Sequence, residues 1–171
     1  SLLDNENENS SDLVQIEFEI AIKLLKEIFE DPSIVKIGHN IKYDYLVLSQ
    51  IKNGSINLYP VHDTMCMSYV VDANRFSHKL DNLAKELLDH DTIKYEDICG
   101  KGAKQVTFDK IHPSDAFNYA AEDADYCLRL YKVLKNDLFL SKLNTVYERI
   151  ERPLIPVISS MEKEGILIDK L

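Results

Sequence analysis

The chain has 171 residues, 45% of them hydrophobic and 29% charged, which is the composition of one globular domain with a single core. Its 20 basic and 29 acidic residues give a net charge of -9, which argues against a protein that binds nucleic acid through a broad basic surface. That charge still allows an enzyme that meets a polyanion through bound divalent metal ions.

Cysteine usage and hydropathy restrict the class further. Cys66, Cys99 and Cys127 are scattered and show no Cys-x-x-Cys spacing, so they indicate neither a disulfide framework nor a zinc site. No apolar run approaches the roughly 20 residues of a membrane span, and the first residues lack a basic-then-apolar signal. We therefore expect a cytoplasmic protein with no membrane partner.

The first third of the chain predicts a tail, a helix and a strand. Residues 4–12 are polar and acidic, so we expect a solvated tail or loop over residues 1–12. A helix is expected next, because apolar side chains recur at spacings of three and four and Asp31-Pro32 closes the segment. These side chains are Ala21, Leu24, Leu25, Ile28 and Phe29. A short β-rich run at residues 34–37 then predicts a strand that ends at Gly38.

The middle third alternates helical and extended patterns. A helix that carries Asp44 follows Gly38 and breaks at residues 53–55, and an extended piece is expected at residues 58–61. A further helix opens at Asp63-Thr64, where Asp63 suits the N-cap position. The apolar periodicity of residues 78–89 predicts one more helix.

The last third is mostly helical. Residues 99–107 predict a glycine-containing basic loop. Its lysines, Lys101 and Lys104, could contact backbone phosphate, but we favour a solvated surface. Residues 113–138 predict the longest helix, with proline at its first position. From residue 141 we expect one or two helices interrupted near Pro153 and Pro156, and then a strand-like run at residues 166–168. The architecture is therefore mixed α/β, with few strands and many helices.

Two short patterns carry candidate chemistry. Tyr119 and Asp123 lie four residues apart on the long predicted helix, so both project from one face and can serve one site. An exposed acidic face on a surface helix would show the same spacing. Asp44 follows a strand end, where α/β folds place functional groups, but an acid there also suits the dipole of a helix N-terminus. Spacing alone leaves both interpretations open.

Taken together, the two patterns resemble a known family. Residues 38–44, Gly-His-Asn-Ile-Lys-Tyr-Asp, resemble the second motif of the 3′-5′ proofreading exonuclease domains of bacterial DNA polymerase I, and residues 119–125 resemble the third. Three shorter matches fall between them in the family's order: Asp63-Thr64-Met65, His78-x-x-Asp81-x-Leu83-Ala84 and Gly100-Lys101-Gly102. The resemblance implies an α/β RNase H-like exonuclease fold that is helix-rich and lacks the first strands of its central sheet.

The resemblance also implies a reaction. Enzymes of this type hydrolyse the 3′-terminal phosphodiester of single-stranded or frayed DNA and release nucleoside monophosphates. Asp44 and Asp123 would be catalytic ligands of two Mg²⁺ or Mn²⁺ ions about 4 Å apart. Tyr119 would complete the catalytic set by orienting the attacking water, because a phenol pKa of roughly 10 suits a base poorly. Asn40, Tyr43 and Tyr95 would contact the last nucleotides, although ordinary packing explains Tyr95 equally well.

One motif of the family is missing. The family carries Asp-x-Glu at the end of an apolar strand, and Asp4-Asn5-Glu6 matches only its letters because no strand precedes it. We therefore expect weak metal binding and little activity from the 171-residue chain itself. The strand at residues 34–37 would keep an unpaired edge, open to self-association or to upstream strands of the same molecule.

The expected organisation is an acidic tail at residues 1–12, a partial exonuclease domain at residues 13–150 and a junction at residues 151–171 that leads into a polymerase domain. The expected partners are the single-stranded 3′ end of DNA and that polymerase domain. Two alternatives stay open: an exoribonuclease similar to RNase D, and a domain that serves a polymerase only as a scaffold.

Overall fold

The computed structural model describes residues 16–51, 55–102 and 105–169. The tail expected at residues 1–12 and Lys104 lie outside the described residues. In chain order, the first elements are α1 (Phe18–Phe29), β1 (Lys36–Gly38), α2 (Ile41–Ser49), β2 (Val61–Asp63), α3 (Thr64–Val71) and α4 (Leu80–Leu88). The later elements are α5 (Tyr95–Cys99), the 3-10 turn η2 (Phe108–Lys110), α6 (Pro113–Leu140), α7 (Asn144–Val146), the π-helical turn η3 (Tyr147–Glu151) and α8 (Arg152–Glu164).

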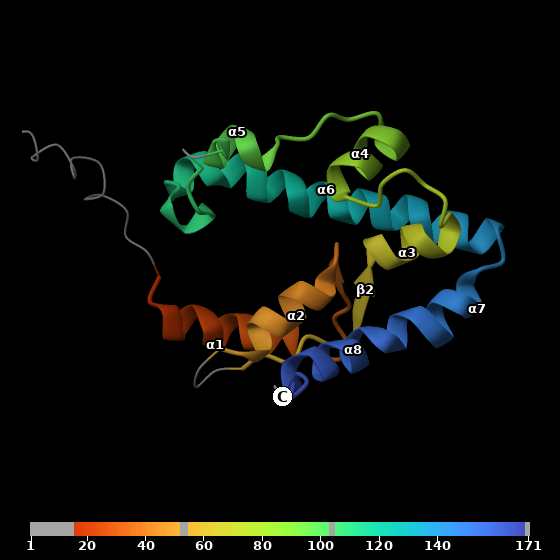
Figure 1. Ribbon diagram of the computed structural model, residues 1–171, viewed down its shortest axis with the longest axis horizontal. Coiled ribbons are helices and arrows are strands. Elements are labelled where there is room, and N and C mark those ends of the chain that lie inside the picture. The colour runs from red at the N-terminus through yellow and green to blue at the C-terminus, as the bar shows by residue number, and fades with distance from the viewer. Residues whose placement is uncertain (1–15, 52–54, 103–104, 170–171) are drawn as a thin grey trace, which may run out of the picture.

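The helices form two layers with a short sheet between them (Figure 1). The layer around α6 contains α3, α4 and α5, and the other contains α1, α2 and α8. Within these layers, α6 packs on α3 and α4, and α2 packs on α8. The sheet thus lies where side chains from both layers can meet.

The sheet consists of β1 and β2, which run parallel with Ile37 opposite His62 and Gly38 opposite Asp63. The Lys36 amide donates to the Pro60 carbonyl at 3.0 Å, so alternation along the strand turns the main-chain groups of Ile37 toward the opposite edge. Within the described ranges no second strand pairs with β1 on that side. Both strands lie about two residues later than the sequence predicts, because a ladder forms only where the two segments run side by side.

The larger core lies under α6. Leu130, Leu134 and Leu138 repeat every four residues and form one buried stripe of this helix. They pack against Met67 of α3, Leu83 of α4 and Tyr147 of η3. The long helix predicted at residues 113–138 is confirmed, and it provides the rigid support on which Tyr119 and Asp123 are mounted.

A smaller core joins the other layer to the sheet. Ile41 of α2, Val61 of β2 and Ile155 of α8 are buried together with Leu58. This cluster fixes the first turn of α2 against the strands. The position of Asp44, three residues after Ile41 on that helix, therefore depends on packing that involves α8.

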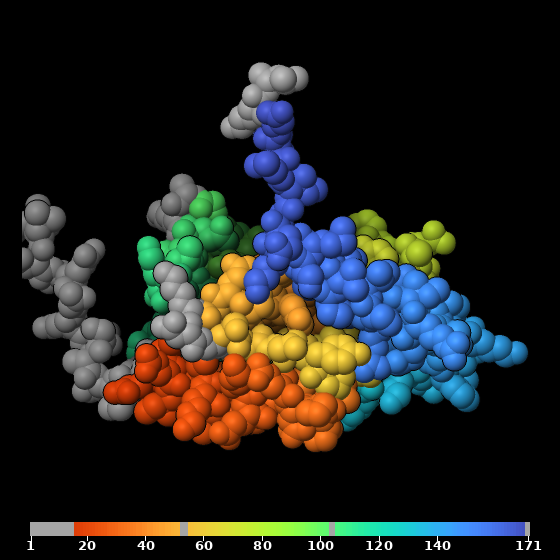
Figure 2. All heavy atoms as spheres, turned by 90° about the horizontal axis from the view of Figure 1, so that it is seen from below, coloured from red at the N-terminus to blue at the C-terminus, as the bar shows by residue number. Residues whose placement is uncertain are grey.

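The C-terminal part confirms one prediction and corrects two. The α-helical pattern is interrupted near Pro153, where the π-helical turn η3 ends and α8 begins, and a missing N–H is tolerated in that first turn. No interruption occurs at Pro156, which lies inside α8. The strand expected at residues 166–168 is wrong. Ile166, Leu167 and Ile168 are 92%, 98% and 77% exposed and have no regular structure, since no strand lies beside them in the described chain. Figure 2 shows this segment standing away from the body.

Helix α1 agrees with the prediction but buries none of its residues. It lies along one face of the molecule in Figure 2, and apolar side chains on it stay exposed: Phe18, Ile20, Leu24, Leu25 and Ile28. Helices of the described ranges are all too short or too polar to cross a membrane.

Candidate active site

Asp44 is placed by a tight strand-to-helix connection. β1 ends at Gly38, Asn40 adopts a left-handed conformation with φ 58°, and α2 begins at Ile41. A Cβ atom on Gly38 would lie 2.8 Å from Ile41 Cδ1, so only glycine allows the strand end and α2 to approach this closely. Asp44 consequently lies in the first turn of α2, just beyond the strand, as the sequence predicts.

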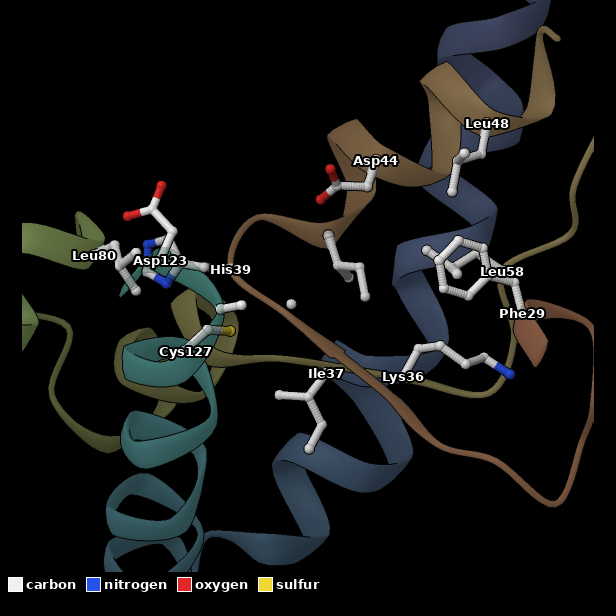
Figure 3. A pocket seen from close by; sticks show the side chains of 13 residues that line it. Phe29, Lys36, Ile37, His39, Asp44, Leu48, Leu58, Leu80, Asp123 and Cys127 are labelled. Atoms are coloured by element: carbon white, nitrogen blue, oxygen red, sulfur yellow. The ribbon is translucent and has the colours of Figure 1, made fainter. Parts of the chain in front are cut away.

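Asp44 and Asp123 line the same cavity, of about 580 Å³. Asp44 enters it from α2 and Asp123 from α6, and in Figure 3 both carboxylates lie toward the end occupied by His39. The other end is lined by the apolar side chains of Phe29, Leu48 and Leu58 together with Lys36. The structure thus brings together the two residues predicted as metal ligands.

The surroundings of these carboxylates disfavour their negative charge. Partial burial raises the pKa of Asp44, and the nearby Asp63 charge adds to the rise. Burial also raises the pKa of Asp123, and the charges of Glu122 and Asp81 reinforce it, whereas a hydrogen bond from Tyr119 opposes it. A bound cation would relieve the cost of holding both groups ionised.

Tyr119 lies one turn before Asp123 on α6, and both residues line a second, more polar cavity of about 480 Å³. Burial raises the pKa of Tyr119 to about 12, and the charge of Asp123 contributes to the rise. The phenol therefore keeps its proton at neutral pH and can donate a hydrogen bond. Asp123 lines both cavities and connects them into one site.

Two aromatic rings, Tyr95 and Tyr119, line the second cavity, and a third, Phe108, packs near both of them outside its lining. Tyr95 begins α5, a short helix that the sequence does not predict, and its ring centroid lies 6.4 Å from that of Tyr119. Phe108 of η2 lies 6.3 Å from Tyr95 and 5.8 Å from Tyr119. Sequence reasoning missed Phe108, for which the only signal is an aromatic residue between the basic loop and the long helix.

The second cavity also contains charged residues to which sequence reasoning gave no role. Lys79 and Asp81 line it from the start of α4, and Lys94 lines it from the residue before α5. Two lysines beside a pair of tyrosines provide cationic and aromatic contacts, the combination that holds single-stranded nucleic acid. Their spacing in sequence gives no sign that they meet.

Glu122, which neighbours Asp123, has a different task. Its carboxylate accepts from His90 Nε2 at 2.8 Å and from the Ile93 amide at 2.6 Å. These two bonds tie the segment before Tyr95 to α6. Glu122 therefore helps to hold one wall of the second cavity.

Two other predicted substrate contacts lie outside the cavities. Asn40 is exposed and acts as the N-cap residue of α2 without a side-chain hydrogen bond, and Tyr43 is 65% exposed. Neither lines either cavity. In the basic loop, Lys101 pairs with Glu96 at 2.6 Å, and both side chains are well exposed, in keeping with a solvated surface.

The donors fit a hard divalent cation but do not complete its shell. Carboxylate oxygens from Asp44 and Asp123 are the ligand type that Mg²⁺ and Mn²⁺ prefer. Over the described ranges, no three His, Cys, Asp or Glu side chains lie close enough to hold a metal ion. Cys127 lines the same cavity as a free thiol, and burial raises its pKa to about 11.

Comparison with known sequences identifies relatives. A family model described as 3′-5′ exonuclease matches residues 3–139. The DNA polymerase I of Rhizobium leguminosarum is 46% identical over 156 residues, which is 91% of this chain and 15% of that protein. The DNA polymerase I of Pseudomonas aeruginosa is 42% identical over 156 residues, which is 91% of this chain and 17% of that protein. The chain therefore spans about a sixth of the length of these relatives.

Solved structures agree with these matches. NrnC of Brucella melitensis superposes with a TM-score of 0.68 and 25% identity, covering 82% of this chain and 64% of that chain. NrnC with bound Mg²⁺ gives a TM-score of 0.66 at 25% identity, with the same coverage of both chains. NrnC bound to pGG, at 24% identity and a TM-score of 0.67 over the same shares, supports the fold alone. The RNase H-like exonuclease fold expected from the sequence is confirmed.

Proposed function

The chain belongs to the 3′-5′ exonuclease family of DNA polymerase I, and from this premise we propose that its site hydrolyses the 3′-terminal phosphodiester of single-stranded or frayed DNA. The observation that carries the proposal is the meeting of Asp44 and Asp123, from two different helices, in one cavity, with Tyr119 one turn before Asp123. The products would be nucleoside monophosphates and a DNA strand one nucleotide shorter.

Asp44 and Asp123 would hold two Mg²⁺ or Mn²⁺ ions. The raised pKa values of both carboxylates support this assignment, because the protein around them disfavours unpaired negative charge. A relative of the same fold has been solved with bound Mg²⁺. When bound, such ions would make the attacking water more acidic and stabilise the charge on the phosphate.

Tyr119 would position the attacking water by donating a hydrogen bond. With its pKa raised to about 12, it retains its proton at neutral pH and cannot serve as the base. In the reaction, a water oxygen bonds to phosphorus and the bond from phosphorus to the 3′-oxygen of the preceding nucleotide breaks. Solvent accepts the proton of the water and returns one to the leaving oxygen.

The second cavity would hold the last nucleotides. Tyr95, against which Phe108 packs, offers a ring face for base stacking, and Lys79 and Lys94 offer positive charge to the phosphates. Asn40 and Tyr43 would contact the DNA strand from the exposed side of the first turn of α2. The net charge of -9 makes such local cationic contacts necessary.

The edge of β1 that has no partner strand within the described residues would be paired in the working enzyme. The larger cavity is lined by all three residues of β1 and ends at Asp44 and Asp123. A strand added along this edge would end beside the two carboxylates, and an Asp-x-Glu sequence at its end would complete the metal ligands. The strand would come either from the longer protein or from a second copy of the chain.

The two carboxylates alone cannot neutralise two divalent cations, so the 171-residue chain by itself would have little activity. Residues 13–150 would form the exonuclease part, and residues 151–171 would lead toward a polymerase domain. Exposed apolar side chains support such a junction, since further polypeptide would cover them. They are Val157 and Met161 of α8, followed by Ile166, Leu167 and Ile168.

An exoribonuclease similar to RNase D is the second candidate, because the same carboxylate and metal chemistry would cleave the 3′-terminal phosphodiester of RNA as well as that of DNA. A scaffold without catalysis is the third. The experiment presents DNA and RNA strands of one sequence to the longest natural protein that contains this chain, as wild type and as Asp123→Asn. Faster loss of 3′ nucleotides from DNA, abolished in the variant, supports the proposal. Faster loss from RNA favours the exoribonuclease, and no loss from either favours the scaffold.

A further inference from the structure

Asp63 has an unusual set of hydrogen-bond partners for a residue that is only 2% exposed. Its carboxylate accepts from four main-chain amides that belong to two helix N-termini. At α3 the donors are Met65 at 2.8 Å and Cys66 at 3.2 Å, as expected of the N-cap predicted from the sequence. At α2 the donors are Asn40 at 3.1 Å and Ile41 at 2.9 Å.

Helix α2 has no cap of its own. The side chain of its N-cap residue, Asn40, makes no capping hydrogen bond, and the left-handed backbone of this residue turns the chain into the helix. Asp63 therefore caps α2 from the neighbouring strand. Its negative charge also lies at the positive end of both helix dipoles, which stabilises this arrangement.

Asp63 is itself held in place from a third direction. The main-chain amide of Asp63 donates a hydrogen bond to the Tyr147 hydroxyl at 3.0 Å, and Tyr147 is buried in the larger core. On the same strand, the Val61 carbonyl accepts from Arg152 Nε of α8 at 2.8 Å. The ladder to Gly38 also holds the main chain of Asp63, so the carboxylate that binds the first turn of α2 keeps its place even when the Tyr147 bond is lost.

We propose that Asp63 is a positioning residue that sets the first turn of α2, and with it Asp44 and Asn40, relative to Asp123 on α6. The inference rests on the proposed function, since Asp63 would act through Asp44 and would not touch substrate or metal. Loss of its bonds would let α2 move while the fold persists. A displacement of about 1 Å at such a site can lower the rate about 10²-fold.

The test compares Asp63→Asn with Tyr147→Phe in the longest natural protein that contains this chain. Asp63→Asn keeps the size of the side chain but turns one acceptor oxygen into a donor that faces amide donors. Tyr147→Phe is the matched control: it removes a buried hydroxyl that bonds the Asp63 amide and His62, at the same strand end, without touching α2. The readouts are kcat, the Mg²⁺ concentration for half-maximal activity, the melting temperature and amide hydrogen exchange.

For Asp63→Asn we expect kcat to fall about 10²-fold and the Mg²⁺ requirement to rise. Exchange should become about tenfold faster or more at the Asn40 and Ile41 amides, while the Leu130 and Leu134 amides of α6 stay unchanged. Tyr147→Phe should lower the melting temperature but change kcat less than about threefold.

Equal losses of kcat in both variants, or unchanged exchange at Asn40 and Ile41 in Asp63→Asn, would overturn the inference. If the wild type shows no 3′-5′ hydrolysis, the proposed function fails, and the exchange experiment alone decides whether Asp63 holds α2. If Asp63→Asn does not fold, Asp63→Glu provides the same readouts, because it keeps the charge and moves the carboxylate by about 1.5 Å.

Discussion

The carboxylates of Asp44 and Asp123 line one cavity, and burial raises the pKa of each. Asp44 is carried by α2, which rests on the smaller core, and Asp123 by α6, which rests on the larger one. Each packed layer thus contributes one acid to the same space. Ionised and without a cation, the two acids destabilise the fold, because their negative charge is partly removed from water. A bound cation would offset this cost.

The first prediction concerns stability without metal. Both folded pKa values lie above the ordinary value of 3.8, so the folded state binds more protons than the unfolded state just above that pH. Stability therefore falls as pH rises through this window, and the loss persists at neutral pH. Asp44→Asn and Asp123→Asn should each raise the melting temperature at pH 7 in a chelator, as measured by differential scanning fluorimetry.

Two controls accompany this measurement. Asp125→Asn changes an exposed acid on α6 that pairs with Arg129 at 2.8 Å, and it should leave the melting temperature nearly unchanged. Mg²⁺ or Mn²⁺ should raise the melting temperature of the wild type but not of the Asp44→Asn, Asp123→Asn double variant. A lower melting temperature for either single variant in the chelator would contradict the assigned electrostatics.

The second prediction concerns Tyr119. An ultraviolet difference titration of the wild type against Tyr119→Phe should show that the phenol lost in the variant ionises above the ordinary tyrosine value of about 10. Loss of one positioned hydrogen bond, worth about 1 kcal/mol, should lower kcat about fivefold to tenfold. The pH profiles of the two proteins should run parallel through the neutral range. An ionisation that the variant loses in that range would identify Tyr119 as a base.

The third prediction concerns Gly38. Gly38→Ala should destabilise the fold by about 1–3 kcal/mol, because the added Cβ would press on the branched side chain of Ile41. Urea denaturation measures this change in the free energy of unfolding. Val47→Ala, at a position on α2 that is 50% exposed, should change it by less than about 0.5 kcal/mol. Equal effects of the two substitutions would show that the strand end tolerates a side chain.

The fourth prediction concerns the lysines of the second cavity. Lys79→Gln and Lys94→Gln should each weaken the binding of single-stranded DNA and flatten its logarithmic salt dependence by about 0.7. Fluorescence anisotropy at several salt concentrations provides both quantities. Lys132→Gln, on the exposed surface of α6 outside both cavities, should leave the salt dependence unaltered. If the wild type and all three lysine variants showed the same salt dependence, the DNA would bind outside the second cavity.

Local sequence signals account for part of this site. The periodicity of α6 and the four-residue spacing of Tyr119 and Asp123 predict a shared helix face, and Gly38 predicts the turn before Asp44. These features depend on neighbours in sequence. The interruption near Pro156 and the strand at residues 166–168 were wrong, because Pro156 is accommodated inside α8 and no strand of the described chain pairs with residues 166–168.

Other parts of the site depend on contacts between distant segments. The N-cap role of Asp63 in α3 follows from local sequence, but its bonds to the amides of Asn40 and Ile41 cross between the two strand ends. The contact of Phe108 with Tyr119 likewise requires the basic loop to fold back on α6. A sequence pattern within one helix or strand does not predict such contacts between distant segments.

The most direct test of the central claim, that Asp44 and Asp123 form one catalytic metal site, is the rate of 3′-nucleotide release from end-labelled single-stranded DNA. It should be measured with Mg²⁺ on the longest natural protein that contains this chain. We expect Asp44→Asn and Asp123→Asn each to lower kcat about 10³-fold or more, and the double variant to lose little beyond the worse single variant. Wild-type rates in either single variant, or losses that multiply in the double variant, would contradict the claim.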